Sequence, residues 1–278
     1  MGILAFIGLG LYGIRDLSLG ALNFLKRAKR VFLEYYTSVI PNFDVNRLAN
    51  FLRKSIEVMS REDIEERGGD IILEAAEKAE VAFLTPGNPF IATTHINLRL
   101  EAEKKGIRTL IYPAPSVIDG IISATGLHSY KLGRSVTIVY PEEDKGYWPL
   151  TPYDVLKGNL SLGLHTLFLL DVKRCENRYM TVREGIQILL DTEKRVGGDI
   201  LEKAVIVGIA RATAPNQRIV AGNICEVMEK EIGPPPHSIV IPGPLHPSEL
   251  EALKVLAGAK EEVLREWDMR VKKELKYT

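Results

Sequence analysis

Three glycines with the spacing of a nucleotide-binding turn follow the first apolar segment of the chain. Residues 7–13, I-G-L-G-L-Y-G, satisfy the pattern G-x-G-x-x-G, in which glycines let the backbone approach a dinucleotide pyrophosphate closely. Two features argue against that ligand. Helical sequence begins only near Asp16, so Gly13 would not open a helix, and Glu34 is only a fair match for the acidic residue that binds a ribose. A nicotinamide cofactor, another closely bound ligand and a purely structural turn remain open.

The turn T-P-G-N-P at residues 85–89 is a second candidate ligand-binding segment, and F-I-A-T-T-H follows it up to His95. Two prolines stiffen this turn and Gly87 permits a positive φ. We expect a helix to begin near Ile91, where its free amides would favour a carboxylate or another anion. The alternative is a tight structural turn between a strand and a helix.

Four further segments lie at the ends of expected strands. They are A-P-S-V at 114–117 with T-G-L-H at 125–128, L-L-D at 169–171, G-I-A-R-A at 208–212, and the proline-rich stretch 233–246 that contains His237 and His246. Each could be an ordinary loop, and His237 alone is more typical of a structural residue. Because ligands bind at the ends of strands in open α/β folds, the set as a whole predicts a ligand site.

Alternating strands and helices must position these segments. Apolar runs at 3–7, 31–33, 56–59, 81–84 and 107–112 alternate with helical patterns at 16–27, 44–52, 71–79 and 91–105, which predicts a parallel sheet covered on both faces in domain 1–112. After Pro113 the connections lengthen. Strands expected at 136–140, 166–170, 204–209, 218–221 and 238–241 predict a mixed sheet in domain 113–278. The fold class is therefore two-domain α/β, with a ligand cleft between the domains.

Local signals place several helix ends in the second domain. Thr151 followed by Pro152 is typical of a helix start, and Thr181-x-x-Glu184 and Ser248-x-x-Glu251 have the spacing of capping boxes. The pattern at 250–275 predicts one long amphipathic helix that packs on the body of the protein or across a dimer.

The composition limits the classes of function. The 278 residues include 36 basic and 36 acidic side chains, so the formal net charge of zero argues against a general nucleic-acid binder. Cys175 and Cys225 form no C-x-x-C pair and the five histidines are scattered, so we expect neither a disulfide framework nor a metal site. No apolar run is long enough to span a bilayer, and the apolar N-terminus lacks the basic region of a signal peptide. These features predict a cytoplasmic protein.

Taken in order, the segments resemble the diphthine synthase family. The similar stretches extend from residue 6 to residue 246 and are F-I-G-L-G-L-Y, T-P-G-N-P-F-I-A-T-T-H, A-P-S-V, T-G-L-H-S-Y-K-L-G, L-H-T-L-F-L-L-D, Y-M-T, A-R-A-T, and P-P-H followed by I-P-G-x-L-H. The resemblance implies a tetrapyrrole methylase-like fold with S-adenosylmethionine in the cleft between two α/β domains. It implies cofactor contacts, mostly through backbone groups, at Leu11, Asn88, Ile91, Ser116, Val117, Leu170, Ala210 and His237.

The same resemblance implies the reaction and the partners. The substrate would be translation elongation factor two carrying a 3-amino-3-carboxypropyl group on a histidine, and repeated methylation of its amine would give diphthine and S-adenosylhomocysteine. A homodimer is also implied. The acceptor amine must lose a proton before each attack, and His95, His128 and Tyr130 are candidates that suit structural roles equally well. No residue is therefore predicted as catalytic, and the number of methyl groups transferred is open.

One position departs from the family pattern. The family commonly has G-D-P where this chain has Gly87-Asn88-Pro89, and loss of the charge would weaken cofactor binding by on the order of 1 kcal/mol.

Two alternative functions stay open. One is a corrin-precursor methyltransferase of the same fold, which a basic cluster at the cleft would favour. The other is a cofactor-binding module without turnover, for which Asn88 is the best argument.

Overall fold

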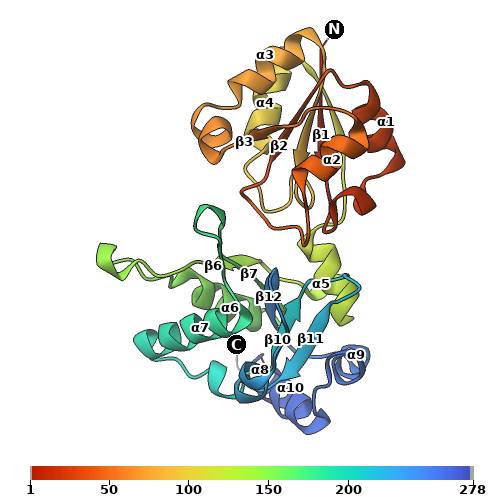
Figure 1. Cartoon of the computed structure of the whole chain (residues 1–278). Coiled ribbons are helices and arrows are strands. Elements are labelled where there is room, and N and C mark those ends of the chain that lie inside the picture. The colour runs from red at the N-terminus through yellow and green to blue at the C-terminus, as the bar shows by residue number, and fades with distance from the viewer. Residues whose placement is uncertain (1, 276–278) are drawn as a thin grey trace. The chain divides into compact units, whose positions relative to one another are not determined.

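The first five apolar segments form one parallel sheet, as the sequence predicts. In the computed structural model, which describes residues 2–275, its strands lie in the order β3-β2-β4-β1-β5 (Figure 1). Their bounds are β1 (Ile3–Gly8), β2 (Arg30–Glu34), β3 (Glu57–Met59), β4 (Glu80–Thr85) and β5 (Arg108–Tyr112). The neighbouring strands pair in parallel, so their carboxyl ends share one edge of the sheet.

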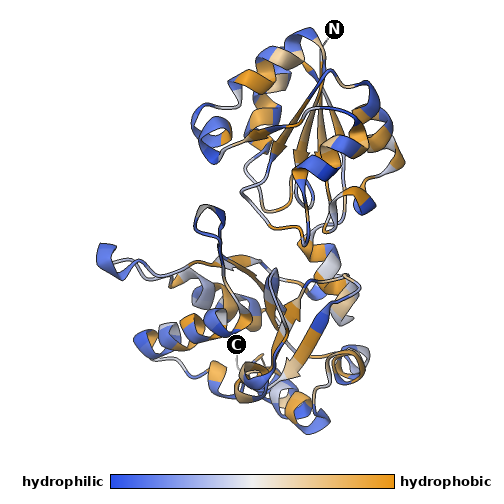
Figure 2. Cartoon of the chain, viewed as in Figure 1, coloured by the Kyte–Doolittle hydropathy of each residue, from blue (hydrophilic) through white to orange (hydrophobic). Residues whose placement is uncertain are grey.

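Helices cover both faces of this sheet. The first pair is α1 (Leu19–Arg27) with α2 (Val45–Leu52), and the second is α3 (Asp70–Lys78) with α4 (Ile96–Lys104). Side chains alternate between the faces of a strand, so Ala5 and Ile7 pack with the first pair, whereas Leu4 and Phe6 pack with the second. This two-sided burial explains why the strands are nearly continuous apolar runs, visible in Figure 2.

The second sheet is mixed, which confirms that prediction. Its order is β11-β10-β12-β7-β6, and among the described strands of this sheet β6 and β7 pair in parallel, whereas the other neighbours pair antiparallel. Its strands are β6 (Val136–Ile138), β7 (Thr166–Leu170), β10 (Ile206–Ala210), β11 (Arg218–Gly222) and β12 (His237–Ile241). A separate two-stranded ribbon consists of β8 (Val172–Lys173) and β9 (Arg178–Tyr179).

The remaining helices belong mostly to the second part of the chain. They are α5 (Val117–Thr125), α6 (Thr151–Ser161), α7 (Val182–Val196), α8 (Ile224–Glu229), α9 (Pro247–Ala257) and α10 (Glu261–Leu275). The short helices are η1 (Gly13–Asp16), η2 (Glu62–Glu66), η3 (Ser129–Lys131), η4 (Glu143–Lys145), η5 (Arg174–Glu176) and η6 (Leu201–Lys203). The chain forms two compact units, Met1–Gly120 and Ile121–Thr278, and passes from one to the other within α5. The expected boundary after residue 112 stays a prediction.

Several helix ends differ from the sequence prediction. The helix expected at 16–27 begins later, because η1 ends at Asp16 and α1 starts at Leu19. Ser18 caps α1 by accepting a hydrogen bond from the Ala21 amide. The single helix expected at 250–275 is two helices, because Gly258 adopts a φ of 67° at the end of α9. The predicted box at Thr181 and Glu184 is confirmed.

Two helix starts are displaced by a residue or more. Leu150, not Thr151, is the N-cap of α6. The box of α9 uses His246 and Glu249 in place of Ser248 and Glu251, since Pro247 opens that helix.

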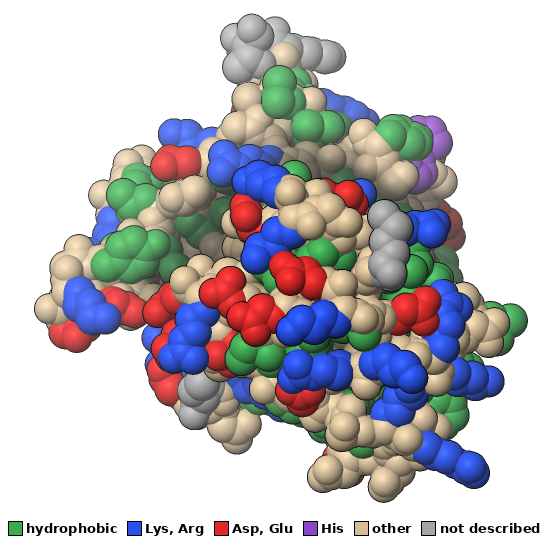
Figure 3. All heavy atoms as spheres, turned by 90° about the horizontal axis from the view of Figure 1, so that it is seen from above, with side chains coloured by type: hydrophobic (Ala, Val, Ile, Leu, Met, Phe, Trp, Pro, Cys, Tyr) green, Lys and Arg blue, Asp and Glu red, His purple; other side chains and the backbone are tan. Residues whose placement is uncertain are grey.

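Charged side chains of both signs are mixed on the surface. On the face drawn in Figure 3, basic and acidic groups are interspersed, in keeping with the net charge of zero. No helix within residues 2–275 is both long and apolar enough to cross a membrane.

Candidate functional site

The loops that follow β1, β4 and β5 meet at the carboxyl edge of the first sheet. The Gly10 amide donates to the Gly87 carbonyl at 3.1 Å, and the Gly87 amide donates to the Gly10 carbonyl at 2.8 Å. A Cβ added to Gly8 would lie 2.5 Å from the Gly87 carbonyl oxygen and 2.8 Å from the Cβ of Ala114. Glycine is therefore required at position 8 because three loops close around it. Next to this contact, a Cβ at Gly87 would meet no atom within 4 Å, so the space beside the Gly87 Cα is open to a ligand.

Asp16 fixes the turn after β1, a role that sequence reasoning missed. Its Oδ2 atom accepts hydrogen bonds from the backbone amides of Leu11 at 2.7 Å and Tyr12 at 2.8 Å. Gly10 has a φ of 62°, and a Cβ at that position would overlap the Asp16 side chain. The short helix η1 begins at Gly13, so no long helix opens at the glycine turn as a dinucleotide site requires. With its amide occupied, Leu11 offers a ligand its carbonyl and side chain.

The loop after β4 is held by its own side chains. Oδ1 of Asn88 accepts a hydrogen bond from the Phe90 amide at 3.0 Å, and the Ile91 amide donates to the Asn88 carbonyl at 3.3 Å. The expectation of a helix start with free amides at Ile91 is wrong, because α4 begins at Ile96 and Ala92 has a φ of 56°. The Ile91 side chain is partly exposed, so it can contact a ligand through apolar surface.

Ser116 and Val117 lie at the start of α5, beside the loop after β5. Oδ2 of Asp119 accepts hydrogen bonds from both the amide and the hydroxyl of Ser116, each at 2.7 Å. Ser116 is almost fully buried. The spacing Ser116-x-x-Asp119 resembles a capping box, and this signal could have identified Asp119 from the sequence.

Three of the expected cofactor contacts lie together where neighbouring strands of the second sheet begin or end. Ala210, the last residue of β10, pairs with His237, the first residue of β12. Ser238 pairs with Leu169, which precedes Leu170 at the end of β7. Leu170, Ala210 and His237 therefore belong to three adjacent strands. The order of the strands brings these distant segments together, since β12 runs antiparallel to both neighbours.

His237 is held as a neutral imidazole. Its Nδ1 accepts a hydrogen bond from the Val182 amide at 3.2 Å, and its Nε2 donates to the Gly233 carbonyl at 2.9 Å. Burial lowers the pKa of His237, and the charge of Arg211 lowers it further. Protonation of Nδ1 would break the hydrogen bond to Val182 at the start of α7, so this arrangement requires the neutral ring.

A buried polar cluster lies behind the loop after β4. His95 Nδ1 donates to the Pro89 carbonyl at 3.0 Å, and His95 Nε2 lies 3.8 Å from Oε1 of the fully buried Glu34. Burial lowers the pKa of His95 and raises the pKa of Glu34. In the described chain, His95 Nε2 and the Tyr36 hydroxyl are the buried side-chain atoms that lack a hydrogen-bond partner. His95 is enclosed by protein, and its bond to Pro89 supports the loop that contains Asn88.

The other two proton-acceptor candidates belong to one network in the second unit. The Tyr130 hydroxyl lies 2.8 Å from His128 Nδ1, and His128 Nε2 lies 3.0 Å from the Ser248 hydroxyl. These hydrogen bonds suit a structural role. That His128 or Tyr130 accepts the proton of the amine stays a prediction. Residues 2–275 contain no group of three or more His, Cys, Asp or Glu side chains placed to hold a metal.

Comparisons with known proteins cover both units. Residues 4–227 match the model of the tetrapyrrole (corrin/porphyrin) methylases. A diphthine synthase of Methanocaldococcus jannaschii is 44% identical over 257 residues, which are 91% of this chain and 98% of that protein. A diphthine synthase of Methanococcus maripaludis (strain S2) is 41% identical over 255 residues, with the same coverage of 91% and 98%.

Solved structures agree with these matches. A crystal structure of a diphthine synthase has a TM-score of 0.86 at 31% identity and covers 95% of this chain and 99% of that chain. A putative diphthine synthase from Entamoeba histolytica has a TM-score of 0.82 at 32% identity, with 92% and 99% covered. The similarity therefore extends over the loops that follow β1, β4 and β5 and over the strand ends of the second sheet that carry Leu170, Ala210 and His237.

Proposed function

This chain belongs to the tetrapyrrole (corrin/porphyrin) methylase family, and on that premise we propose that it methylates translation elongation factor two in diphthamide biosynthesis. It is an S-adenosylmethionine-dependent methyltransferase. The acceptor is the amine of a 3-amino-3-carboxypropyl group on a histidine, and the product is diphthine. The observation that carries this proposal is the 44% identity to a diphthine synthase over 98% of that protein.

The residues present suit the cofactor. The glycine contact between the first two loops leaves open space beside the Gly87 Cα, and the turn at Leu11 does not form the helix start that a dinucleotide needs. We propose that Leu11, Asn88, Ile91, Ser116 and Val117 of the first unit contact the cofactor. Leu170, Ala210 and His237 are proposed contacts from the second unit.

The chain's own contribution is to bind and orient the reactants. When bound, S-adenosylmethionine supplies a methyl group on a positively charged sulfur that an amine can attack. Asp16, Asp119 and His95 each hold one of the loops in place through backbone hydrogen bonds, which keeps the proposed contacts preorganised. No strong base is required at the moment of transfer, but each attack needs a deprotonated amine.

A labelling experiment tests the proposed function. We expect the protein to transfer labelled methyl groups to elongation factor two only when the factor carries the precursor side chain, and mass spectrometry of the factor counts them. Cofactor binding without transfer to the modified factor would overturn the proposal in favour of a binding module. Transfer to a tetrapyrrole polycarboxylate instead would favour the corrin-precursor alternative.

Two further expectations stay predictions. One is the homodimer, which analytical ultracentrifugation checks, and the other is the cytoplasmic location.

Asn88→Asp is expected to tighten the binding of S-adenosylmethionine about fivefold, which corresponds to about 1 kcal/mol for a charge-assisted contact. One carboxylate oxygen can still accept the hydrogen bond from Phe90, so the turn persists while a negative charge is added near a cationic cofactor. Calorimetric titration measures the affinity. Asn88→Ala serves as the control, since it removes the acceptor and should weaken binding. An unchanged or lower affinity of the Asp variant would contradict the assignment of Asn88.

A further inference from the structure

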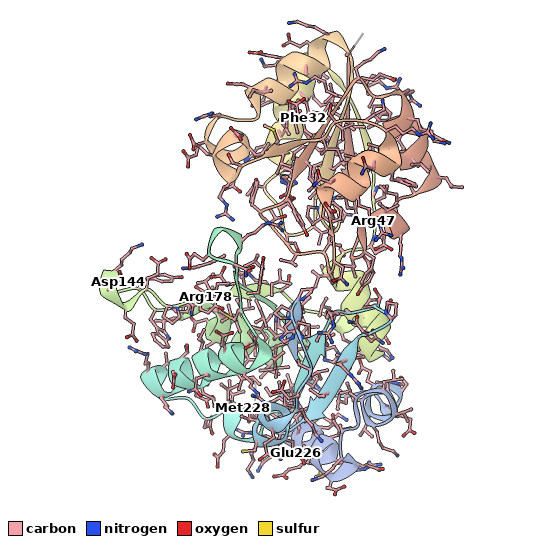
Figure 4. All side chains as sticks on the ribbon, in the orientation of Figure 1. Phe32, Arg47, Asp144, Arg178, Glu226 and Met228 are labelled. Carbon is pink, nitrogen blue, oxygen red and sulfur yellow. The ribbon has the colours of Figure 1, made fainter. Side chains whose placement is uncertain are left out.

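Two cations face each other across the ribbon that follows β7. Lys173 on β8 pairs directly with Arg178 on β9, which is labelled in Figure 4. Like charges placed opposite one another destabilise a pair of strands. Both cations also lie against the ring of Tyr140, with Arg178 Cζ at 3.6 Å and Lys173 Nζ at 5.8 Å from its centroid. A two-residue ribbon that concentrates positive charge in this way is suited to an anion.

Arg178 and Lys173 differ in their ion pairs within the described chain. Lys173 has a carboxylate neighbour in Glu142 at 3.9 Å, but Arg178 forms no ion pair among residues 2–275. Arg195 provides the contrast, because it stacks on Trp148 at 3.8 Å and also pairs with Glu143 at 3.3 Å. Arg178 is exposed, so its guanidinium keeps N–H donors for a ligand.

Tyr140 holds Arg178 at a defined place. The Tyr140 amide donates to Asp171 Oδ2 at 3.1 Å, its hydroxyl donates to Glu184 at 3.4 Å, and its side chain is buried. Asp171 directly follows Leu170, one of the proposed cofactor contacts. The stacked guanidinium is therefore fixed beside the sheet edge that carries the proposed cofactor residues of this unit.

We propose that Arg178, with Lys173 beside it, binds the carboxylate of the acceptor side chain whose amine is methylated. This inference rests on the proposed function. The carboxylate and the amine of a 3-amino-3-carboxypropyl group are attached to the same carbon, so a residue that fixes the carboxylate also fixes the nucleophile. A planar guanidinium can bind a carboxylate through two parallel hydrogen bonds, which orients it as well as attracting it.

Steady-state kinetics with the precursor form of elongation factor two test this role. We expect Arg178→Ala to lower kcat/KM roughly ten- to hundredfold, as for loss of a hydrogen bond between charged groups, with unchanged affinity for S-adenosylhomocysteine. Arg178→Lys should restore part of the loss. Arg195→Ala is the matched control, since it removes an exposed stacked arginine that already has a carboxylate partner, and it should leave kcat/KM unaltered. Equal kinetics for Arg178→Ala and wild type would overturn the inference.

A competition experiment separates the side-chain carboxylate from other anions of the acceptor protein. Methylated factor with a free carboxylate, and the same factor with a primary carboxamide there, are compared as inhibitors. Wild type should bind the carboxylate form more tightly, and Arg178→Ala should bind both alike. If Arg178→Ala weakens both forms equally, the arginine contacts another part of the acceptor and the inference fails. If the wild-type protein neither methylates the precursor form of the factor nor binds either methylated form, both the proposed function and this inference are overturned.

Discussion

Gly8→Ala is expected to reduce the affinity for S-adenosylhomocysteine by at least about tenfold and to abolish detectable methyl transfer. The new Cβ would lie 2.5 Å from the Gly87 carbonyl oxygen and 2.8 Å from the Ala114 Cβ. Neither atom belongs to a flexible side chain, so the loops after β4 and β5 must move away from the loop after β1. That movement would separate Leu11, Asn88 and Ser116, which we propose contact one ligand. Calorimetric titration measures the loss.

Gly106→Ala is the control for Gly8→Ala. Gly106 lies between α4 and β5, at the opposite edge of the same sheet, and has a φ of 74° with no atom within 4 Å of an added Cβ. Alanine there should cost about 1 kcal/mol of stability through backbone strain without altering cofactor affinity. If Gly8→Ala binds S-adenosylhomocysteine as tightly as Gly106→Ala does, the loop contact at Gly8 does not build the cofactor site.

The parallel sheet and the place of the loops could be predicted because both depend on short-range pattern. Strands buried on two faces must be nearly all apolar, and the carboxyl ends of parallel strands share an edge, so glycine and proline turns after such strands necessarily gather there. The mixed second sheet followed from longer connections and capped helices. These are properties of neighbouring residues, which a single sequence contains.

The contacts that fix the loops could not be predicted in the same way. Asp16 accepts hydrogen bonds from the amides of Leu11 and Tyr12, and Gly10, which has a positive φ and no Cβ, leaves room for its side chain. The spacing of the glycines alone does not determine this conformation. His95 donates to the Pro89 carbonyl, and with this bond the segment before Ile96 forms an irregular turn where periodicity indicated helix. Side-chain hydrogen bonds to the backbone compete with helix formation, and their outcome depends on the packed environment.

Glu249→Ala is expected to destabilise the second unit by about 3–5 kcal/mol, the cost of breaking a buried charge pair. The Glu249 carboxylate is fully buried and accepts hydrogen bonds from Lys131, from His165 Nε2 at 2.8 Å, and from the backbone amides of His128 at 2.9 Å and His246 at 2.8 Å. Its removal would leave the Lys131 ammonium with the Pro244 carbonyl as an acceptor but without a counter-charge, and it would take away the acceptor of His165 and of the two backbone amides. Both tryptophans of the chain, Trp148 and Trp267, lie in this unit, so tryptophan fluorescence during denaturant unfolding reports its stability.

We expect the Glu249 carboxylate also to determine how the stability of the second unit changes at acidic pH. Burial would raise the pKa of Glu249, but the hydrogen bonds from His165 and Lys131 outweigh it and hold this pKa well below its usual range. The stabilisation is therefore present above the unfolded pKa of about 4.3 and is lost as the pH falls from there through the folded pKa. Wild type should lose stability steeply below that pH, and Glu249→Ala should lose less. Glu251→Ala removes an exposed partner of Lys254 from the same helix and should change stability little at either pH. Equal losses for Glu249→Ala and Glu251→Ala at neutral pH would show that the buried network does not hold the unit together.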